Sequence, residues 1–219
     1  MCGRIFIQPS SKLNELLSGL GLEGAELPKL NNLAPTENIP VIRHGVTGGM
    51  ELTPMRWWLH PSWSKEEPNQ KFATFNARIE TVQTSPTFQS PVKHHRGIVP
   101  ASAFVEWQTK GKHKQPFLIE GTEEPLALAA IWDLWQSDLY SCAIITQPAN
   151  ESFSKIHNRM PLALTMAQAK QWLNPHANAG ELLSAFSGDC IELTAKKIEA
   201  SVNNARNKAD AVFLPSTTD

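Results

Sequence analysis

Two uncharged, strongly apolar segments in the second half of the chain constrain its fold more than any other feature. They are Leu126 to Trp132 and Ser141 to Thr146. Segments of this length and composition are typical of central strands that are buried on both faces. Neither segment approaches the length of a membrane-spanning helix. We therefore expect a sheet whose middle is formed by these two segments.

Pairs of shorter strand-like runs surround these segments and predict antiparallel hairpins. Ile39–Arg43 and Met50–Trp57 are separated by a stretch rich in glycine. A glycine-rich turn between two such runs is typical of a hairpin. Ala103–Gln108 and Phe117–Glu120 are joined in the same way through the basic turn 110–114. The sequence therefore indicates mostly antiparallel pairing.

Helix signals occur near both ends of the chain and once before the middle. Ser10 or Ser11 can cap a helix in which leucines recur at helical spacing. Thr165–Gln168 and Asn178–Glu181 fit the capping-box pattern that opens a helix. Asn76 is also a residue type that caps helices, so we expect a helix to begin there.

Together these elements predict an α+β fold. We expect a single domain over residues 1–219, built on a mainly antiparallel, barrel-like sheet with peripheral helices. Gly3–Ile7 is expected to add a short strand, and Asn31–Thr36 to form a polar loop.

Composition narrows the class of protein. The net charge of −1 argues against non-specific coating of nucleic acid, although a local basic groove remains compatible with it. Three widely spaced cysteines, Cys2, Cys142 and Cys190, form no CxxC pair and indicate neither a disulfide framework nor a zinc knuckle. The seven histidines show no metal-binding spacing. We expect no metal, no cofactor, no membrane contact and a soluble cytoplasmic protein, or a nuclear one in a eukaryote.

Cys2 is the most reactive candidate in the sequence because it follows the initiator methionine. Removal of Met1 would leave a residue with an α-amine and a thiol on adjacent carbons. Their pKa values in model peptides lie near ~7.7 and ~8.5, so both groups have reactive fractions at neutral pH. A 1,2-aminothiol condenses with an aldehyde to a five-membered thiazolidine. The alternative is a small residue near a frayed terminus.

Three further positions are candidates for site chemistry. Glu106 lies among apolar residues, and a partly desolvated carboxyl suits proton transfer, although the alternate face of a strand can also meet solvent. His157 follows a predicted central strand and its loop, where it is either catalytic or structural. Asn76 and Arg78 offer an amide and a guanidinium suited to anions, and Arg78 can equally be a solvated surface residue.

Eight segments, taken in their order and spacing, resemble the SOS-response-associated peptidase (SRAP) family, whose members process abasic sites in DNA. The resemblance covers nearly the whole chain. The segments are Met1–Arg4, Asn32–Pro35, Trp57–Trp63, Asn76–Glu80, Pro100–Trp107, Ile144–Asn150, His157–Pro161 and Val202–Asn204.

The chain also departs from the family pattern. It has Trp57-Trp58-Leu59 where the family usually has Trp-Gly-Leu. It has Ala103 and Val105 where the family usually has glycine and an aromatic residue. These departures concern the expected pocket wall and DNA contacts rather than the reactive residues.

The resemblance implies an enzyme that crosslinks itself to DNA. Its Cys2 would attack the ring-opened aldehyde of an abasic site and close a thiazolidine, which shields the lesion. Asn76 would hold the ring or the amine, Glu106 would shuttle protons, and His157 would assist sugar opening and reversal. The DNA-binding residues implied are Arg4, Arg78 and Arg159 for phosphates, Trp63 for a base, and Asn32 and Pro35.

The implied partner is single-stranded DNA with abasic sites, bound by a monomer that is nucleoid-associated when on DNA. Two other classes stay open. Class II glutaminases also begin Met-Cys-Gly, in which case Cys2 would be the nucleophile of an amidohydrolase. A non-catalytic reader of modified DNA would instead use the tryptophans and the basic turn.

Overall fold

The computed structural model describes residues 2–189 and 191–215. Its strands are β1 (Arg4–Ile7), β2 (Leu30–Leu33), β3 (Asn38–His44), β4 (Met50–Arg56), β5 (Asn76–Arg78), β6 (Arg96–Ala101), β7 (Ala103–Lys110), β8 (His113–Gly121), β9 (Leu126–Trp135), β10 (Leu139–Pro148), β11 (Arg159–Pro161), β12 (Ala163–Leu164) and β13 (Leu193–Lys197). Its helices are α1 (Ser11–Gly19), α2 (Gln89–His94), α3 (Glu151–Ser154), α4 (Met166–Leu173), α5 (Ala179–Phe186) and the 3₁₀ turn η1 (Ala200–Asn203).

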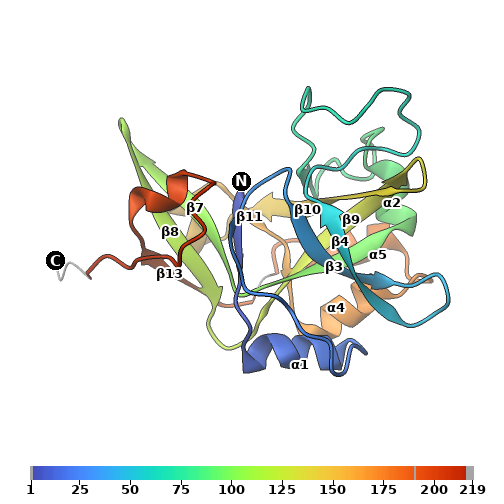
Figure 1. Ribbon diagram of the computed structural model, residues 1–219, viewed down its shortest axis with the longest axis horizontal. Coiled ribbons are helices and arrows are strands. Elements are labelled where there is room, and N and C mark those ends of the chain that lie inside the picture. Colours follow the sequence, from blue (N-terminus) through green and yellow to red (C-terminus); the bar gives the residue numbers. More distant parts are fainter. Residues whose placement is uncertain (1, 190, 216–219) are drawn as a thin grey trace.

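The larger sheet closes partly on itself. Its strand order is β11-β10-β4-β3-β6-β9-β12, and β10 also pairs with β9, so five strands form a ring. The predicted central segments are β9 and β10, which pair antiparallel over six residue pairs. The expected α+β fold with a barrel-like, largely antiparallel sheet is confirmed (Figure 1).

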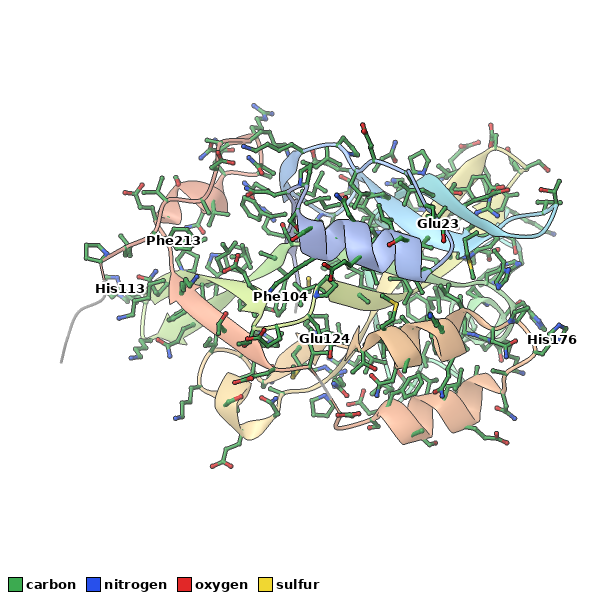
Figure 2. All side chains as sticks on the ribbon, turned by 90° about the horizontal axis from the view of Figure 1, so that it is seen from below. Glu23, Phe104, His113, Glu124, His176 and Phe213 are labelled. Carbon is green, nitrogen blue, oxygen red and sulfur yellow. The ribbon has the colours of Figure 1, made fainter. Side chains whose placement is uncertain are left out.

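The smaller sheet has the order β13-β8-β7-β1-β2 and lies beside the ring (Figure 1). One face of it packs into the main core through residues such as Phe104, which Figure 2 shows in the interior. The other face carries a second small core. That core consists of Phe6, Ala103, Val105, Leu118, Ile198 and Val202.

The helices form where the sequence predicts them. Ser10 caps α1, whose Leu13, Leu16 and Leu17 are buried. Thr165 and Gln168 form a complete capping box at the start of α4. Seen from below, α1, α4 and α5 cover one side of the molecule (Figure 2). No helix in the described part of the chain is long and apolar enough to cross a membrane.

Two local predictions are wrong. Asn76 does not cap a helix: it begins β5, which pairs in parallel with residues 144–146 of β10. The expected loop Asn31–Thr36 begins within β2, because residues 30–33 pair with β1. In both places a partner far away in the sequence supplies the backbone hydrogen bonds, and this pairing overrides the local signal.

Arg96 belongs to the basic run Lys93-His94-His95-Arg96, and it has a structural role. Arg96 is buried, and its guanidinium donates to five backbone carbonyls at the ends of α2 and α4 and in the chain that follows α4. The Arg96 guanidinium therefore stabilises the packing of α2 and α4 against β6.

Candidate active site at the seam of the two sheets

Cys2 and Gly3, which precede β1, lie at a seam between the two sheets. β1 pairs antiparallel with β7, and the last pair toward the N-terminus is Arg4 with Val105. If the same register is continued by two residues toward the N-terminus, Cys2 lies opposite Trp107. Within the described residues, no strand pairs with that edge of β7 beyond Val105.

Cys2 and Asn76 are in direct contact. Cys2 is 0% exposed, and its carbonyl accepts a hydrogen bond from Nδ2 of Asn76 at 2.9 Å. Asn76 is itself buried, and its Oδ1 has no hydrogen-bond partner among the residues that the structure describes. A buried acceptor without a partner is costly, so this oxygen is suited to a group that arrives later. The structure therefore joins Cys2, which precedes β1 of the smaller sheet, to Asn76 on the larger sheet.

The Cys2 thiol lies in a setting that opposes ionisation. Burial raises its pKa above the ordinary range, and the nearby charge of Glu106 raises it further, while the positive N-terminus opposes both effects. The expected reactive fraction of the thiol at neutral pH concerns the chain without Met1, and it stays a prediction. The same electrostatic contribution shows that Glu106 lies close to Cys2.

Glu106 and His157 line one cleft. Glu106 is 1% exposed, so its side chain lies at the floor. The other lining residues are Trp107, Thr109, Lys114 and Asn203. Because the pairing with β1 ends at Arg4, side chains from both faces of β7 reach this open edge. The predicted acid–base pair is therefore brought together in space.

A short loop holds the ring of His157. Nδ1 of His157 lies 3.0 Å from the backbone nitrogen of Arg159 and 3.1 Å from its carbonyl oxygen. These contacts hold the ring in the loop after α3, just before β11 pairs with β10. Arg159 therefore occupies Nδ1 in either tautomer of a neutral ring.

Sequence reasoning gave no role to Trp107 or Asn203, although both line the cleft. Nε1 of Trp107 donates to Oδ1 of Asn203 at 2.7 Å. Arg4 lies over the Trp107 ring, 5.9 Å from its centroid, and donates to the Asn203 carbonyl at 3.3 Å. The segment 202–204 was noted in the sequence, but its contact with β7 spans 96 residues and carries no local signal.

Arg78 and Arg159 have different surroundings. Arg78 is exposed at the end of β5. Arg159 makes a two-pronged ion pair with Glu80, and its guanidinium also donates to the carbonyl of Thr146 at 2.6 Å. This pairing lowers the pKa of the Glu80 carboxyl. Arg78 is thus available to an anion, whereas Arg159 already has one.

Asn32 and Pro35 lie away from the cleft lining. Asn32 is 1% exposed, and its amide donates to the carbonyls of Val202, Asn204 and Asn207. Its backbone adopts a left-handed φ of 48°, which asparagine tolerates better than most residues. Pro35 is half-buried in the turn before β3. These positions support an indirect role: Asn32 holds the segment that carries Asn203.

Trp63 lies on a separate groove formed by the 58–74 loop. It is 61% exposed, and Trp58 and Phe72 line the same groove. The Trp58 ring packs 5.1 Å from Phe75, next to Asn76 in the chain. The unusual tryptophan at position 58 therefore adds an aromatic ring to this groove and packs against the residue that precedes Asn76.

The other two departures from the family pattern affect packing. Ala103 and Val105 are both buried in the small core under η1 and do not line the cleft. Among the described residues, no three histidine, cysteine, aspartate or glutamate side chains are grouped to hold a metal. Cys142 is a buried free thiol, and Cys190 lies outside the described residues.

A model of the family described as "SOS response associated peptidase (SRAP)" matches residues 1–205. The chain belongs to the SRAP family. This confirms the resemblance. It also leaves the class II glutaminase alternative without support, because that alternative depended on the first residues alone.

Curated SRAP relatives carry names that describe abasic-site processing. Abasic site processing protein YoqW of Bacillus subtilis is 32% identical, over 95% of this chain and 97% of the relative. Abasic site processing protein YedK of Escherichia coli is 27% identical, over 76% of each. Abasic site processing protein HMCES of Gallus gallus is 32% identical over 75% of this chain and 57% of its own length.

Solved structures support the fold. A protein from Bacteroides thetaiotaomicron is 25% identical, with a TM-score of 0.72 over 90% of this chain and 93% of that chain. A protein from Bordetella bronchiseptica superimposes with a TM-score of 0.76 at 22% identity, over 90% of this chain and 100% of that chain.

The burial of Cys2 predicts slow thiol chemistry in the folded protein. We expect iodoacetamide to modify Cys2 at least about 10-fold more slowly in the native state than in urea, since the thiolate is the reactive form. Glu106→Gln removes a negative charge beside the thiol, so the pKa of Cys2 should fall and modification should become up to about 10-fold faster. The rate is measured by mass spectrometry of the N-terminal peptide.

The matched control is Glu124→Gln, which removes an exposed carboxylate elsewhere and should leave the rate unchanged. Equal rates in folded and unfolded protein would contradict the buried position of the thiol.

Proposed function

We propose that this protein captures abasic sites in single-stranded DNA by forming a covalent bond through Cys2. The observation that carries the proposal is the meeting of Cys2, Asn76, Glu106 and His157 at one seam, although they come from four separate segments. The names of the SRAP relatives support abasic DNA as the substrate. The crosslink would shield the lesion during the response to DNA damage.

The chemistry requires that Met1 be removed, which would free the α-amine of Cys2. That amine would add to the aldehyde carbon of the ring-opened sugar and give a carbinolamine. Loss of one water would leave an imine. The thiol sulfur would then add to the imine carbon while its proton passes to the nitrogen. The sum is aldehyde plus aminothiol giving thiazolidine plus water.

Asn76 would position the reacting residue. Its Nδ2 already donates to the Cys2 carbonyl. Its Oδ1 is a buried acceptor with no partner among the described residues, and it is suited to the new amine or to the ring N–H that replaces it. Such contacts favour catalysis because they fix the nucleophile before the aldehyde arrives.

Glu106 and His157 would divide the proton transfers. Glu106 lies deeper in the cleft and close to the thiol, so it suits dehydration of the carbinolamine and removal of the sulfur proton. His157 lies at the cleft wall with Nδ1 occupied by Arg159, so Nε2 would serve the sugar oxygen during ring opening and during reversal.

Binding of the strand would use charge and stacking. Arg4 at the cleft and the exposed Arg78 would contact phosphates. The aromatic surface at Trp63 would stack on a base, a contact that does not depend on sequence. Arg159 would act on DNA mainly by shaping the site, since Glu80 holds its guanidinium. Any peptidase activity would be limited to removal of Met1 or to release of the crosslink.

The roles of the amine and the thiol can be separated. Cys2→Ala keeps an α-amine after Met1 removal, so it should form only an imine, which survives denaturing gels after borohydride reduction and not before. The unmodified protein should give a stable adduct without borohydride. Cys142→Ala is the control, because that buried thiol lies outside the site. A stable adduct of unchanged yield in Cys2→Ala would sink the proposal.

Glu106 and His157 should differ by direction of reaction. Glu106→Gln keeps the size of the side chain but cannot exchange a proton, so crosslinking should slow by about 10²-fold. His157→Ala should slow adduct formation. It should slow the exchange of the adduct onto a competing abasic oligonucleotide by a larger factor. Both rates are followed on denaturing gels. Equal slowing of both directions in both variants would mean that the two residues act as one unit.

A further inference from the structure

The hairpin of β7 and β8 extends from the candidate site to one end of the molecule. β7 and β8 pair without interruption from Phe104 with Ile119 to Lys110 with His113. In Figure 1 the hairpin tip (green) projects beyond the body of the protein, and Figure 2 shows His113 at the outer end. The turn is Gly111-Lys112, and Gly111 has the positive φ of 60° that a tight hairpin turn requires there.

This tip is positively charged and lacks acidic residues. Lys110, Lys112, His113 and Lys114 are all exposed. No acidic residue occurs between Glu106 and Glu120. A protein with a net charge of −1 therefore concentrates three lysines within five residues beside its candidate site.

The lysines of the tip form no ion pair with any residue that the structure describes. Other exposed lysines are paired, such as Lys29 with Asp210 and Lys208 with Glu37. Within the described ranges 2–189 and 191–215, no carboxylate lies within 4.0 Å of the ammonium groups at positions 110, 112 and 114. Ammonium groups without such partners are available to bind an external anion.

The charged surface is continuous with the cleft. Lys114 pairs across the hairpin with Thr109, and both line the cleft whose floor holds Glu106. From Glu106 to Lys110 the strand rises by roughly 13 Å at about 3.3 Å per residue. Stacked nucleotides rise about 3.4 Å each, so this length matches three to four of them. The exposed Lys155 flanks the hairpin on its other side, where Gln108 donates to its carbonyl at 2.7 Å.

We propose that the hairpin tip 110–114 is a phosphate-binding arm for single-stranded DNA. Its lysines would follow the backbone of the strand as it leaves the cleft, with Lys114 nearest the captured sugar. The identity of the polyanion as DNA rests on the function proposed above. The contacts are electrostatic, so the arm would add affinity without sequence preference.

The test uses an intact single-stranded oligonucleotide, so that binding is non-covalent and independent of crosslinking. The variant replaces Lys110, Lys112 and Lys114 by glutamine. Affinity falls as salt rises, and each phosphate contact on a single strand contributes about −0.7 to the slope of log affinity against log salt. Loss of three contacts should therefore make the slope less steep by about 2. The ratio of wild-type to variant affinity should then shrink about 16-fold between 50 and 200 mM salt.

The control removes the same charge from other places: Lys12→Gln, Lys93→Gln and Lys170→Gln together, on α1, α2 and α4, away from the hairpin tip 110–114 (Figure 1). Its slope should match the wild type. Three results would each overturn the proposed phosphate-binding arm. They are an unchanged slope in the hairpin variant, equal losses of slope in both variants, and no binding of the intact strand by the wild type at 50 mM salt. Failure of crosslinking with abasic DNA would instead overturn the proposed function, and the two failures are measured separately.

Discussion

The antiparallel pairing of β1 with β7 is the interaction on which the site depends. It ends at Arg4 and Val105, so Cys2 and Gly3 pass along an open edge of β7 beside Glu106. The pairing is held by burial on both faces: Ile5 and Ile7 belong to the main core and Phe6 to the small core. A shift of one residue would exchange those faces and would move Cys2 away from the seam. The position of the reactive residue is thus fixed by the packing of the strand that follows it.

The second constraint is the contact between the two sheets at that seam. Asn76 from the ring sheet holds the backbone of Cys2, while Glu106 from the smaller sheet acts on its thiol. His157 reaches the same cleft from the loop after α3. Burial raises the pKa of the Cys2 thiol, which suits the proposed order in which the α-amine attacks the aldehyde before the sulfur does.

The sequence predicts those elements whose signals are local. The apolar segments that form β9 and β10, the two hairpins and the capped helices α1 and α4 all have such signals, and they are confirmed. The candidates Cys2, Glu106 and His157 could be chosen because each stands out from its neighbours in chemistry. That Glu106 and His157 share one cleft depends on the pairing of distant strands, which no local pattern encodes.

Other differences from the local signals have the same cause. Asn76 has the local signal of a helix cap, but its pairing with β10 makes it a strand residue. The phosphate-binding role of Arg159 stays a prediction, and the structure adds that Glu80, 79 residues away, holds its guanidinium. Asn32 looks like a polar loop residue, yet its amide fastens the segment that carries Asn203. In each case a partner far along the chain decides the surroundings of the side chain.

The most direct measurement is the mass and location of the product formed with an oligonucleotide that carries one abasic site. The protein without Met1 is incubated with it, without any reductant, and the intact adduct is weighed and then digested for peptide mapping. The account predicts a mass equal to protein plus DNA less one water, with the modification on Cys2. No adduct, or an adduct on another residue such as Lys114, would contradict it.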